Sequence, residues 1–149
     1  MIDGVEVIQL KRIPDERGAV LKVLSRDDPH FAGFGEVFIS TVHPGAIKGW
    51  HASEKAVRNY CVVKGMIKLV LYDDRPASKT KGEISEMFIG DDNYCLVKIP
   101  TGVWSGFKGI GSKDAMVMNI FTEPYAYDAV KRLDPYDPKI KYDWALKNK

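Results

Sequence analysis

The sequence predicts an all-β sandwich or barrel, and three observations support this fold class. Short runs rich in β-branched and aromatic residues recur along the chain, and Gly, Pro, Asp and Asn separate them. Many short strands with turn residues between them are typical of sandwiches and barrels. The length of 149 residues is common for one domain, and a hydrophobic fraction of 45% is enough for one core. We therefore expect residues 1–149 to form a single domain.

The strand-like runs follow one another with short connections. In chain order they are Val5–Leu10, Ala19–Leu24, Glu36–Val42, Val57–Val63, Met66–Tyr72, Ile84–Ile89, Tyr94–Ile99 and Ala115–Phe121. Lys64-Gly65 interrupts one long run and is expected to form a hairpin turn. Pro100 and Gly102 suit a tight turn with proline at its second position. Tyr125–Leu133 is expected to form one or two helical turns near the C-terminus, because prolines just beyond it stop a longer helix.

The composition argues against several classes of partner. A net charge of +2 is too small to indicate nucleic acid or a membrane surface, although a local basic cluster would suit phosphates. Cys61 and Cys95 lie in apolar runs without metal-ligand spacing, so we expect buried thiols in a reducing compartment. The first residues lack an apolar signal core, and no run approaches the roughly 20 apolar residues that span a bilayer. The expected location is the cytoplasm.

The candidate catalytic residue is His51, the last histidine in the sequence, which follows a lysine and a tryptophan in Ile47-Lys48-Gly49-Trp50-His51. A neutral imidazole is the usual protein base near pH 7, so this setting suits a proton acceptor beside an anionic ligand. An ordinary surface or hydrogen-bonded histidine is the alternative. His30 and His43 lie in a loop and a turn, and there is no His-x-His pair, so we expect neither a metal nor another cofactor. A serine hydrolase is also disfavoured, because no serine lies in a Gly-x-Ser-x-Gly elbow.

A set of short motifs, taken in order, resembles one known family. The motifs are Asp15-Glu16-Arg17-Gly18, Lys48-Gly49-Trp50-His51, Asp73-Asp74-Arg75-Pro76-Ala77-Ser78-Lys79-Thr80-Lys81-Gly82, Ile99-Pro100-Thr101-Gly102, Ser105-Gly106-Phe107, and Asp137-Pro138 seven residues before Trp144. None is specific alone, but in this order they resemble the dTDP-4-dehydrorhamnose 3,5-epimerases, from about Ile13 to Trp144. The resemblance implies a cupin-type jelly-roll and activity on 4-keto-6-deoxy nucleotide sugars.

The resemblance also implies roles for three catalytic residues. His51 matches the family's catalytic base, and Asp137 matches the carboxylate that orients it. Such a carboxylate would fix the tautomer of the imidazole and raise its basicity. Arg58 falls where the family usually has a lysine near the reacting carbonyl, and a cation there would stabilise an enolate. From the residues alone, a turn before Pro138 is the favoured explanation of Asp137, and a cross-strand ion pair is the alternative for Arg58.

Substrate-binding roles are implied for three further residues. Arg17 and Lys48 match basic positions that neutralise the diphosphate, with Lys48 in place of an arginine. A lysine supplies a point charge without the bidentate geometry of a guanidinium. Tyr125 matches a tyrosine that packs against the pyrimidine base. Solvated surface charges and a packing tyrosine are the structural alternatives.

Departures from the family pattern place the complete 3,5-epimerase mechanism in question. Ser105 replaces a second active-site histidine, and Asn119 replaces the family's tyrosine acid. Epimerisation needs a base on one face of the sugar and a proton donor on the other, and an amide is not an acid. Glu36 and Phe38 replace residues that are often glutamine and asparagine, so contacts to sugar or phosphate are expected to differ.

Three functions follow from these observations. The first is an isomerase or single-centre epimerase of a nucleotide-linked keto sugar, with Tyr125, Tyr127, a water or another group returning the proton. The second is a non-catalytic nucleotide-sugar binding or accessory protein. The third is a cupin enzyme with different carbohydrate chemistry. The expected partner is a nucleotide-diphosphate sugar, dTDP-linked by resemblance, and the expected assembly is a homodimer, which would cover edge strands.

Overall fold

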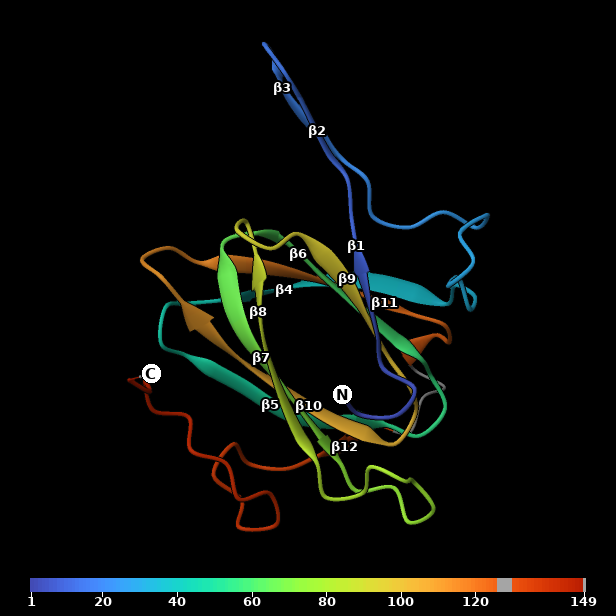
Figure 1. Cartoon of the computed structure of the whole chain (residues 1–149), viewed down its shortest axis with the longest axis vertical. Coiled ribbons are helices and arrows are strands. Elements are labelled where there is room, and N and C mark those ends of the chain that lie inside the picture. The colour runs from blue at the N-terminus through green and yellow to red at the C-terminus, as the bar shows by residue number, and fades with distance from the viewer. Residues whose placement is uncertain (126–129, 149) are drawn as a thin grey trace.

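Two antiparallel sheets form the body of the protein in a computed structural model that describes residues 1–125 and 130–148. Within these residues each sheet has five strands, and the sheets face each other (Figure 1). The first sheet has the order β1 (Glu6–Gln9), β9 (Cys95–Ile99), β6 (Arg58–Lys64), β11 (Ala115–Phe121) and β4 (Glu36–Val42). The second has the order β12 (Val130–Arg132), β5 (Ile47–Ser53), β10 (Val103–Ile110), β7 (Met66–Asp73) and β8 (Ile84–Gly90). The all-β sandwich predicted from the sequence is confirmed.

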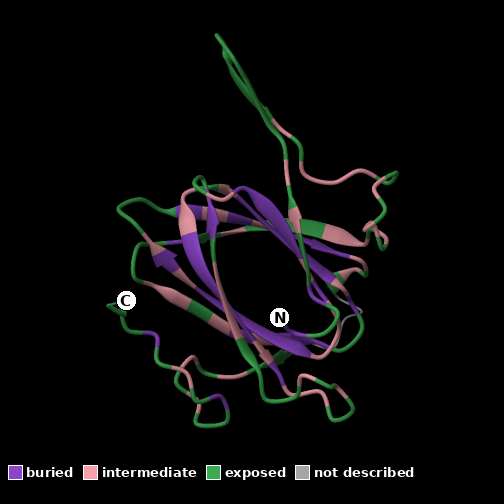
Figure 2. Ribbon diagram, viewed as in Figure 1, coloured by how far each residue is buried: buried purple, intermediate pink, exposed green. Residues whose placement is uncertain are grey.

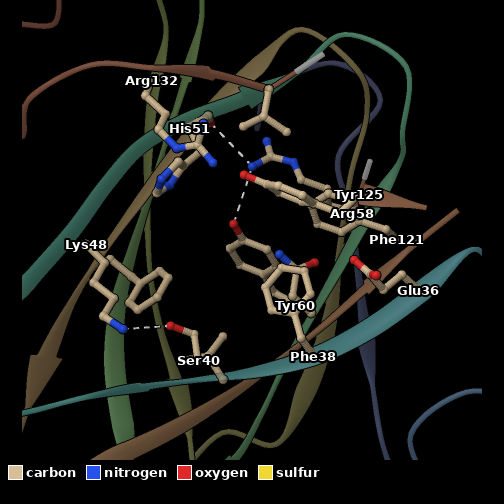
Figure 3. Close-up of a pocket in the computed structure, with 14 residues that line it drawn as sticks. Glu36, Phe38, Ser40, Lys48, His51, Arg58, Tyr60, Phe121, Tyr125 and Arg132 are labelled. Atoms are coloured by element: carbon tan, nitrogen blue, oxygen red, sulfur yellow. Dashed lines mark hydrogen bonds between the residues drawn. The ribbon is translucent and has the colours of Figure 1, made fainter. Parts of the chain in front are cut away.

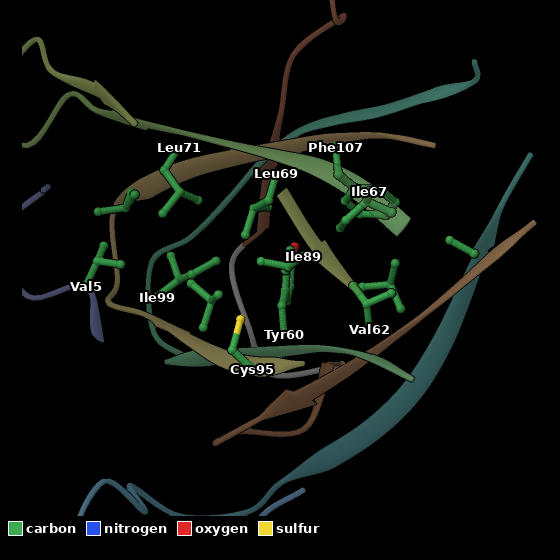
Figure 4. Close-up of a cluster of buried hydrophobic side chains, with 14 of the residues drawn as sticks. Val5, Tyr60, Val62, Ile67, Leu69, Leu71, Ile89, Cys95, Ile99 and Phe107 are labelled. Atoms are coloured by element: carbon green, nitrogen blue, oxygen red, sulfur yellow. The ribbon is translucent and has the colours of Figure 1, made fainter. Parts of the chain in front are cut away.

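The main core lies between the two sheets. Strand β7 sends Ile67, Leu69 and Leu71 into this space, as the two-residue period of a strand requires. They meet Val62 and Ile99 from the first sheet (Figure 4). Burying an aliphatic side chain of this size stabilises the fold by about 1.5–3 kcal/mol. Figure 2 shows burial concentrated on these facing strands.

A second apolar layer covers the outer face of the second sheet. The C-terminal segment lies there, and its Trp144 packs on Trp50 of β5 with ring centroids 5.1 Å apart. Both indole N–H groups donate to the carbonyl of Pro135, at 3.2 Å from Trp50 and 3.0 Å from Trp144. Val70 of β7 also joins this cluster, which explains why β7 is buried on both faces.

Strands β5 and β10 were not expected from the sequence. Each contains glycine, which ordinarily interrupts strand patterns, but here glycine permits close packing. A Cβ on Gly49 would lie 2.8 Å from the Cα of Gly106 in the paired strand. A Cβ on Gly106 would lie 3.1 Å from the Trp144 ring. The glycines therefore let two backbones and an indole approach one another.

One local expectation was wrong, and a second was wrong for residues 130–132. Lys64-Gly65 does not form a hairpin, because β6 and β7 belong to different sheets, so the turn at Gly65 crosses from one sheet to the other. Val130–Arg132 is strand β12 rather than helix, because it pairs with Ser53–His51 of β5. Tyr125, at the start of the expected helical segment, has 3₁₀-helical conformation, and residues 126–129 lie outside the described residues. The expectation of buried thiols is confirmed, since Cys61 and Cys95 are buried and unpaired.

A short hairpin projects from the body of the sandwich. It consists of β2 (Arg12–Asp15) and β3 (Gly18–Leu21), and its side chains are largely exposed (Figures 1 and 2). No helix in the described part of the chain is long and apolar enough to cross a membrane.

The motif from Asp73 to Gly82 forms a hydrogen-bond network at the C-terminal end of β7. The buried carboxylate of Asp73 accepts hydrogen bonds from Arg75 Nε and Nη2, both at 2.8 Å. The hydroxyls of Ser78 and Thr80 each donate to the same carboxylate at 2.6 Å. Arg75, followed by these hydroxyls, holds the pKa of Asp73 well below its usual range. The motif therefore anchors a loop.

Replacing Asp73 should destabilise the fold without changing the cavity described in the next subsection, because Asp73 does not line it. Asp73→Ala leaves a guanidinium and two hydroxyls without their acceptor, and we expect a loss of about 3 kcal/mol in the free energy of unfolding. Asp74→Ala is the matched control, because its ion pair with Lys139 is at the surface and should contribute less than about 1 kcal/mol. Urea denaturation measures both variants, and equal losses would contradict this account.

Candidate active site

A cavity of about 400 Å³ opens between the two sheets, where edge strand β4 faces β5 and β12. Its ionisable lining comprises Glu36, Lys48, His51, Arg58 and Arg132. Its aromatic lining comprises Phe38, Tyr60, Phe107, Phe121 and Tyr125. Ser40, Val117, Asn119 and Val130 complete it. Figure 3 shows these side chains converging from both sheets.

A β-bulge lets β5 present two site residues to the cavity. Side chains on one face of a strand are normally an even number of residues apart, but Lys48 and His51 are three apart. Opposite them, Phe107 pairs with Lys48 and Ser105 with His51, so three steps on β5 match two on β10. Bulges of this kind re-aim side chains beside functional sites. The irregular pairing therefore brings a cation and an imidazole to the same wall.

Arg58 is a buried cation without a carboxylate partner. Its side chain is 1% exposed, and among the described residues it forms no ion pair. Nη1 donates to Ser105 Oγ at 2.7 Å, and Nη2 donates to the carbonyl of Val103 at 2.7 Å. Nη1 also contacts Tyr60 Oη and the carbonyl of His51, each at 3.3 Å. A fixed, uncompensated charge of this kind favours an anion in the adjacent cavity.

His51 is held in its neutral form. Burial, followed by the positive charges of Arg132, Arg58 and Lys48, lowers the pKa of His51 from 6.5 to about 4. The imidazole is therefore unprotonated near pH 7 and able to accept a proton. A bound anion would offset these cations and raise the basicity of His51.

The structure shows no hydrogen bond between the Asp137 carboxylate and the His51 ring. Its carboxylate accepts the backbone N–H of Lys139 at 2.9 Å, and its carbonyl accepts that of Ile140 at 3.1 Å. Asp137 thus closes a turn in the segment that packs on the outer face of the second sheet. Across residues 1–125 and 130–148, no carboxylate forms a hydrogen bond or ion pair with the His51 ring. The expected orienting pair is not assembled within these residues.

The cavity contains a second arginine that the sequence analysis missed. Arg132 of β12 is the register partner of His51, and its guanidinium lies 5.8 Å from the centroid of the Tyr125 ring. Lys48 of the neighbouring strand β5 also lines the cavity, and its Nζ donates to Ser40 Oγ at 2.9 Å. Among the described residues of the lining, Arg132, Lys48 and Arg58 give three cations against one carboxylate, that of Glu36. The electrostatic balance suits a phosphate-bearing ligand.

Three aromatic rings form a wall of the cavity. Phe38 and Phe121 have centroids 5.4 Å apart, and Tyr125 lies 5.9 Å from Phe121 and 6.2 Å from Phe38. Phe38 and Tyr125 are each 37% exposed, so part of each ring remains accessible. Accessible aromatic faces are suited to stacking a planar base.

The remaining expected site residues are divided between the cavity and its surroundings. Asn119 lines the cavity, and its buried Oδ1 has no hydrogen-bond partner among the residues described. Ser105 lies behind the lining, where it accepts from Arg58. Arg17 lies at the tip of the projecting hairpin and pairs with Asp15 at 2.8 Å. Arg17 is therefore not part of the cavity of its own chain, and Tyr127 lies outside the described residues.

The depressed pKa of His51 predicts an unusual titration. In the free protein, the His51 C2 proton should titrate near pH 4 in an NMR experiment, and His51→Asn should remove its signal. Because Arg132 contributes to the shift, Arg132→Met should move the midpoint upward, whereas Arg12→Met on the projecting hairpin should not. Between about pH 6.5 and 4 the unfolded chain takes up a proton that the folded chain does not, so stability falls as pH decreases through this window. A midpoint near 6.5 would contradict the site electrostatics.

The fold and cavity define a cupin-type jelly-roll protein with a site for an anionic ligand, and the comparisons identify its family. Residues 1–149 match the model of the family described as dTDP-4-dehydrorhamnose 3,5-epimerase. The chain belongs to this family, which confirms the resemblance seen in the sequence. Family membership places the chain among the nucleotide-sugar epimerases and isomerases.

Two curated relatives and one solved structure are similar over nearly the whole chain. A probable low-salt glycan biosynthesis epimerase, Agl13 of Haloferax volcanii, is 35% identical over 95% of this chain and 89% of its own length. The spore coat polysaccharide biosynthesis protein SpsL of Bacillus subtilis is 35% identical over 97% of both chains. A crystal structure of a dTDP sugar isomerase from Desulfovibrio desulfuricans has a TM-score of 0.94 and 35% identity, covering 99% of this chain and 94% of that one.

Proposed function

We propose that the protein is an epimerase or isomerase that removes a proton next to the ketone of a 4-keto-6-deoxy sugar carried on a nucleoside diphosphate. One observation carries the proposal: a neutral His51 lines the same cavity as a buried Arg58, which has no carboxylate partner in the described part of the chain. A base and a fixed cation are the two groups that enolate formation needs. Family membership supports the reaction class, and the name of the Desulfovibrio relative supports a dTDP-linked substrate.

The proposed reaction begins at His51. The imidazole takes a proton from a carbon beside the C4 ketone, and the C–H electron pair moves toward the carbonyl. Negative charge then develops on the carbonyl oxygen, where the guanidinium of Arg58 stabilises it. Arg58 is already held by Ser105 and Val103, so little reorganisation is needed when the charge appears. Return of the proton from the opposite face would complete inversion.

The outer part of the cavity is proposed to hold the nucleotide. Lys48 and Arg132 would neutralise the diphosphate, and the guanidinium of Arg132 can form two parallel hydrogen bonds with a phosphate. Phe38 and Tyr125 would stack on the base, as their accessible rings allow. No metal or other cofactor has a part in this proposed mechanism.

We also propose a homodimer. The projecting hairpin exposes Ile13 and Val20, and edge strand β4 exposes Val37 and Ile39 on the face away from the cavity. Exposed apolar residues on a hairpin and an edge strand gain stability by packing against a second copy. Such an assembly would allow Arg17 to reach the site of a neighbouring chain rather than its own.

A nucleotide-sugar binding or accessory role is the second candidate. It is favoured by Asn119, whose amide stands where the family pattern has a tyrosine acid. A protein of this kind would retain the cations and the aromatic wall but would not catalyse turnover. Its predicted behaviour is binding of the nucleotide sugar without exchange of any sugar proton.

Deuterium exchange distinguishes these functions. The wild-type protein is incubated in D₂O with dTDP-4-keto-6-deoxyglucose, and the C3 and C5 protons are followed by NMR. We expect one of the two signals to disappear as an inverted product forms, whereas dTDP-glucose, which lacks the ketone, should not exchange. Binding without exchange would support the accessory role. The absence of both binding and exchange would contradict the proposed substrate class.

A further inference from the structure

A buried phenol faces the cavity from the sheet opposite His51. Tyr60 lies on β6 of the first sheet, whereas His51 lies on β5 of the second, and both line the cavity (Figure 3). Tyr60 is two residues from Arg58, so the period of the strand places both on the cavity face. A base and a phenol on opposing walls match the two faces of a sugar ring. We propose that Tyr60 is the proton donor of this site, an assignment that rests on the proposed epimerase function.

The contacts of Tyr60 suit proton donation. Its Oη lies 3.3 Å from Arg58 Nη1 and 3.1 Å from Ser105 Oγ, and the side chain is 3% exposed. A phenol that gives up its proton becomes a phenolate, which the guanidinium would stabilise by charge and the serine by donating a hydrogen bond. Arg58 also donates to the backbone carbonyl of His51, so the same guanidinium contacts both the proposed acid and the residue proposed as the base.

The position of Tyr60 accounts for the missing acid at Asn119. These two residues are register partners on adjacent strands β6 and β11, and both line the cavity. Cβ atoms of directly paired residues are separated by roughly 5 Å, so a phenol moved from one position to the other stays within the same site. Tyr125, the other described tyrosine in the lining, belongs to the exposed aromatic wall instead.

The proposed step is balanced without a further reactant. His51 removes the proton from the carbon beside the ketone, and the C–H electrons form the enolate. Tyr60 then transfers its phenolic proton to the same carbon from the opposite face, which restores the ketone with inverted configuration. This leaves an imidazolium at His51 and a phenolate at Tyr60. Loss of one proton to water and gain of another return both groups to their starting states.

Tyr60→Phe tests the assignment by separating exchange from inversion. The variant retains the ring that packs edge-on against Phe107 at 6.2 Å, and its melting temperature should confirm a folded protein. In D₂O, His51 should still exchange the sugar proton with retained configuration, whereas formation of inverted product should fall by about a hundredfold or more. Tyr94→Phe is the matched control, because the Tyr94 hydroxyl donates to the Lys22 carbonyl outside the cavity.

The exchange and inversion rates of Tyr60→Phe and of the wild type test the donor assignment and the proposed function separately. Exchange retained with inversion lost supports Tyr60 as donor. Inversion at the wild-type rate, or equal loss of exchange and inversion, overturns this assignment while leaving the proposed function intact. Absence of exchange in the wild type overturns the proposed function, and the Tyr60 assignment with it.

A second measurement detects proton donation directly. If Tyr60 must be protonated, the inversion rate of the wild type should fall at alkaline pH. Incorporation of 3-fluorotyrosine at position 60, which makes the phenol more acidic, should move that alkaline limb to lower pH. A tyrosine that only supports Arg58 would leave the limb unmoved, and that result would contradict the proposal.

Discussion

His51→Asn should lower deuterium exchange into the keto sugar by about a thousandfold or more. General base catalysis contributes roughly 10²–10⁴-fold to such reactions, and an asparagine amide does not accept a proton near pH 7. Binding of dTDP should persist, because Lys48 and Arg132 supply the charge proposed to hold the phosphates. Exchange is measured by NMR in D₂O, and dTDP affinity by calorimetry. The expected result is therefore a loss of chemistry with retention of binding.

The matched control is His43→Asn. His43 is exposed, pairs with Asp114 at 2.8 Å and does not line the cavity, so exchange should remain at the wild-type rate. Exchange that survives His51→Asn would contradict the assignment of the base. Loss of dTDP binding together with exchange would show that the imidazole is needed to hold the ligand rather than to react with it.

The strands that the sequence predicted well are those with regular burial patterns. In β7 and β11, β-branched and aliphatic residues face packed layers, so the local pattern carries the necessary information. Strands β5 and β10 were missed because their glycines serve contacts between distant segments. The close approach of Gly49 to Gly106, and of Gly106 to Trp144, is a tertiary requirement that a single-strand pattern does not contain.

The same distinction applies to the site residues. Tyr60 was predictable in principle, because it follows Arg58 by two residues in an expected strand and must share its face. Arg132 was not, because β12 is a strand only through its pairing with β5. Asp137 is a different case. Its motif spacing matched the family, but in this structure the carboxylate caps a turn in the segment that covers the outer face of the second sheet.

Arg58→Met should lower exchange by about 10²–10³-fold with only a small loss of stability. The loss follows from removing the cation that stabilises the enolate, which is comparable to deleting an oxyanion-hole donor. The loss of stability should be small, because among the described residues the guanidinium has no carboxylate partner that would be left as an unpaired buried charge, and only hydrogen bonds to neutral groups such as Ser105 and Val103 are lost. The pKa of His51 should also move upward, since Arg58 is one of the cations that lower it.

Arg75→Met provides the opposite case, and the pair of variants tests whether Arg58 serves catalysis or folding. Arg75 donates two hydrogen bonds to the buried carboxylate of Asp73, so its removal leaves that charge uncompensated and should lower the free energy of unfolding by about 3 kcal/mol. Exchange should be unaffected, because Arg75 lies outside the cavity. If Arg58→Met loses as much stability as Arg75→Met, Arg58 is a structural cation and the enolate assignment fails. If Arg58→Met loses mainly activity, the buried cation at position 58 serves the reaction and not the stability of the fold.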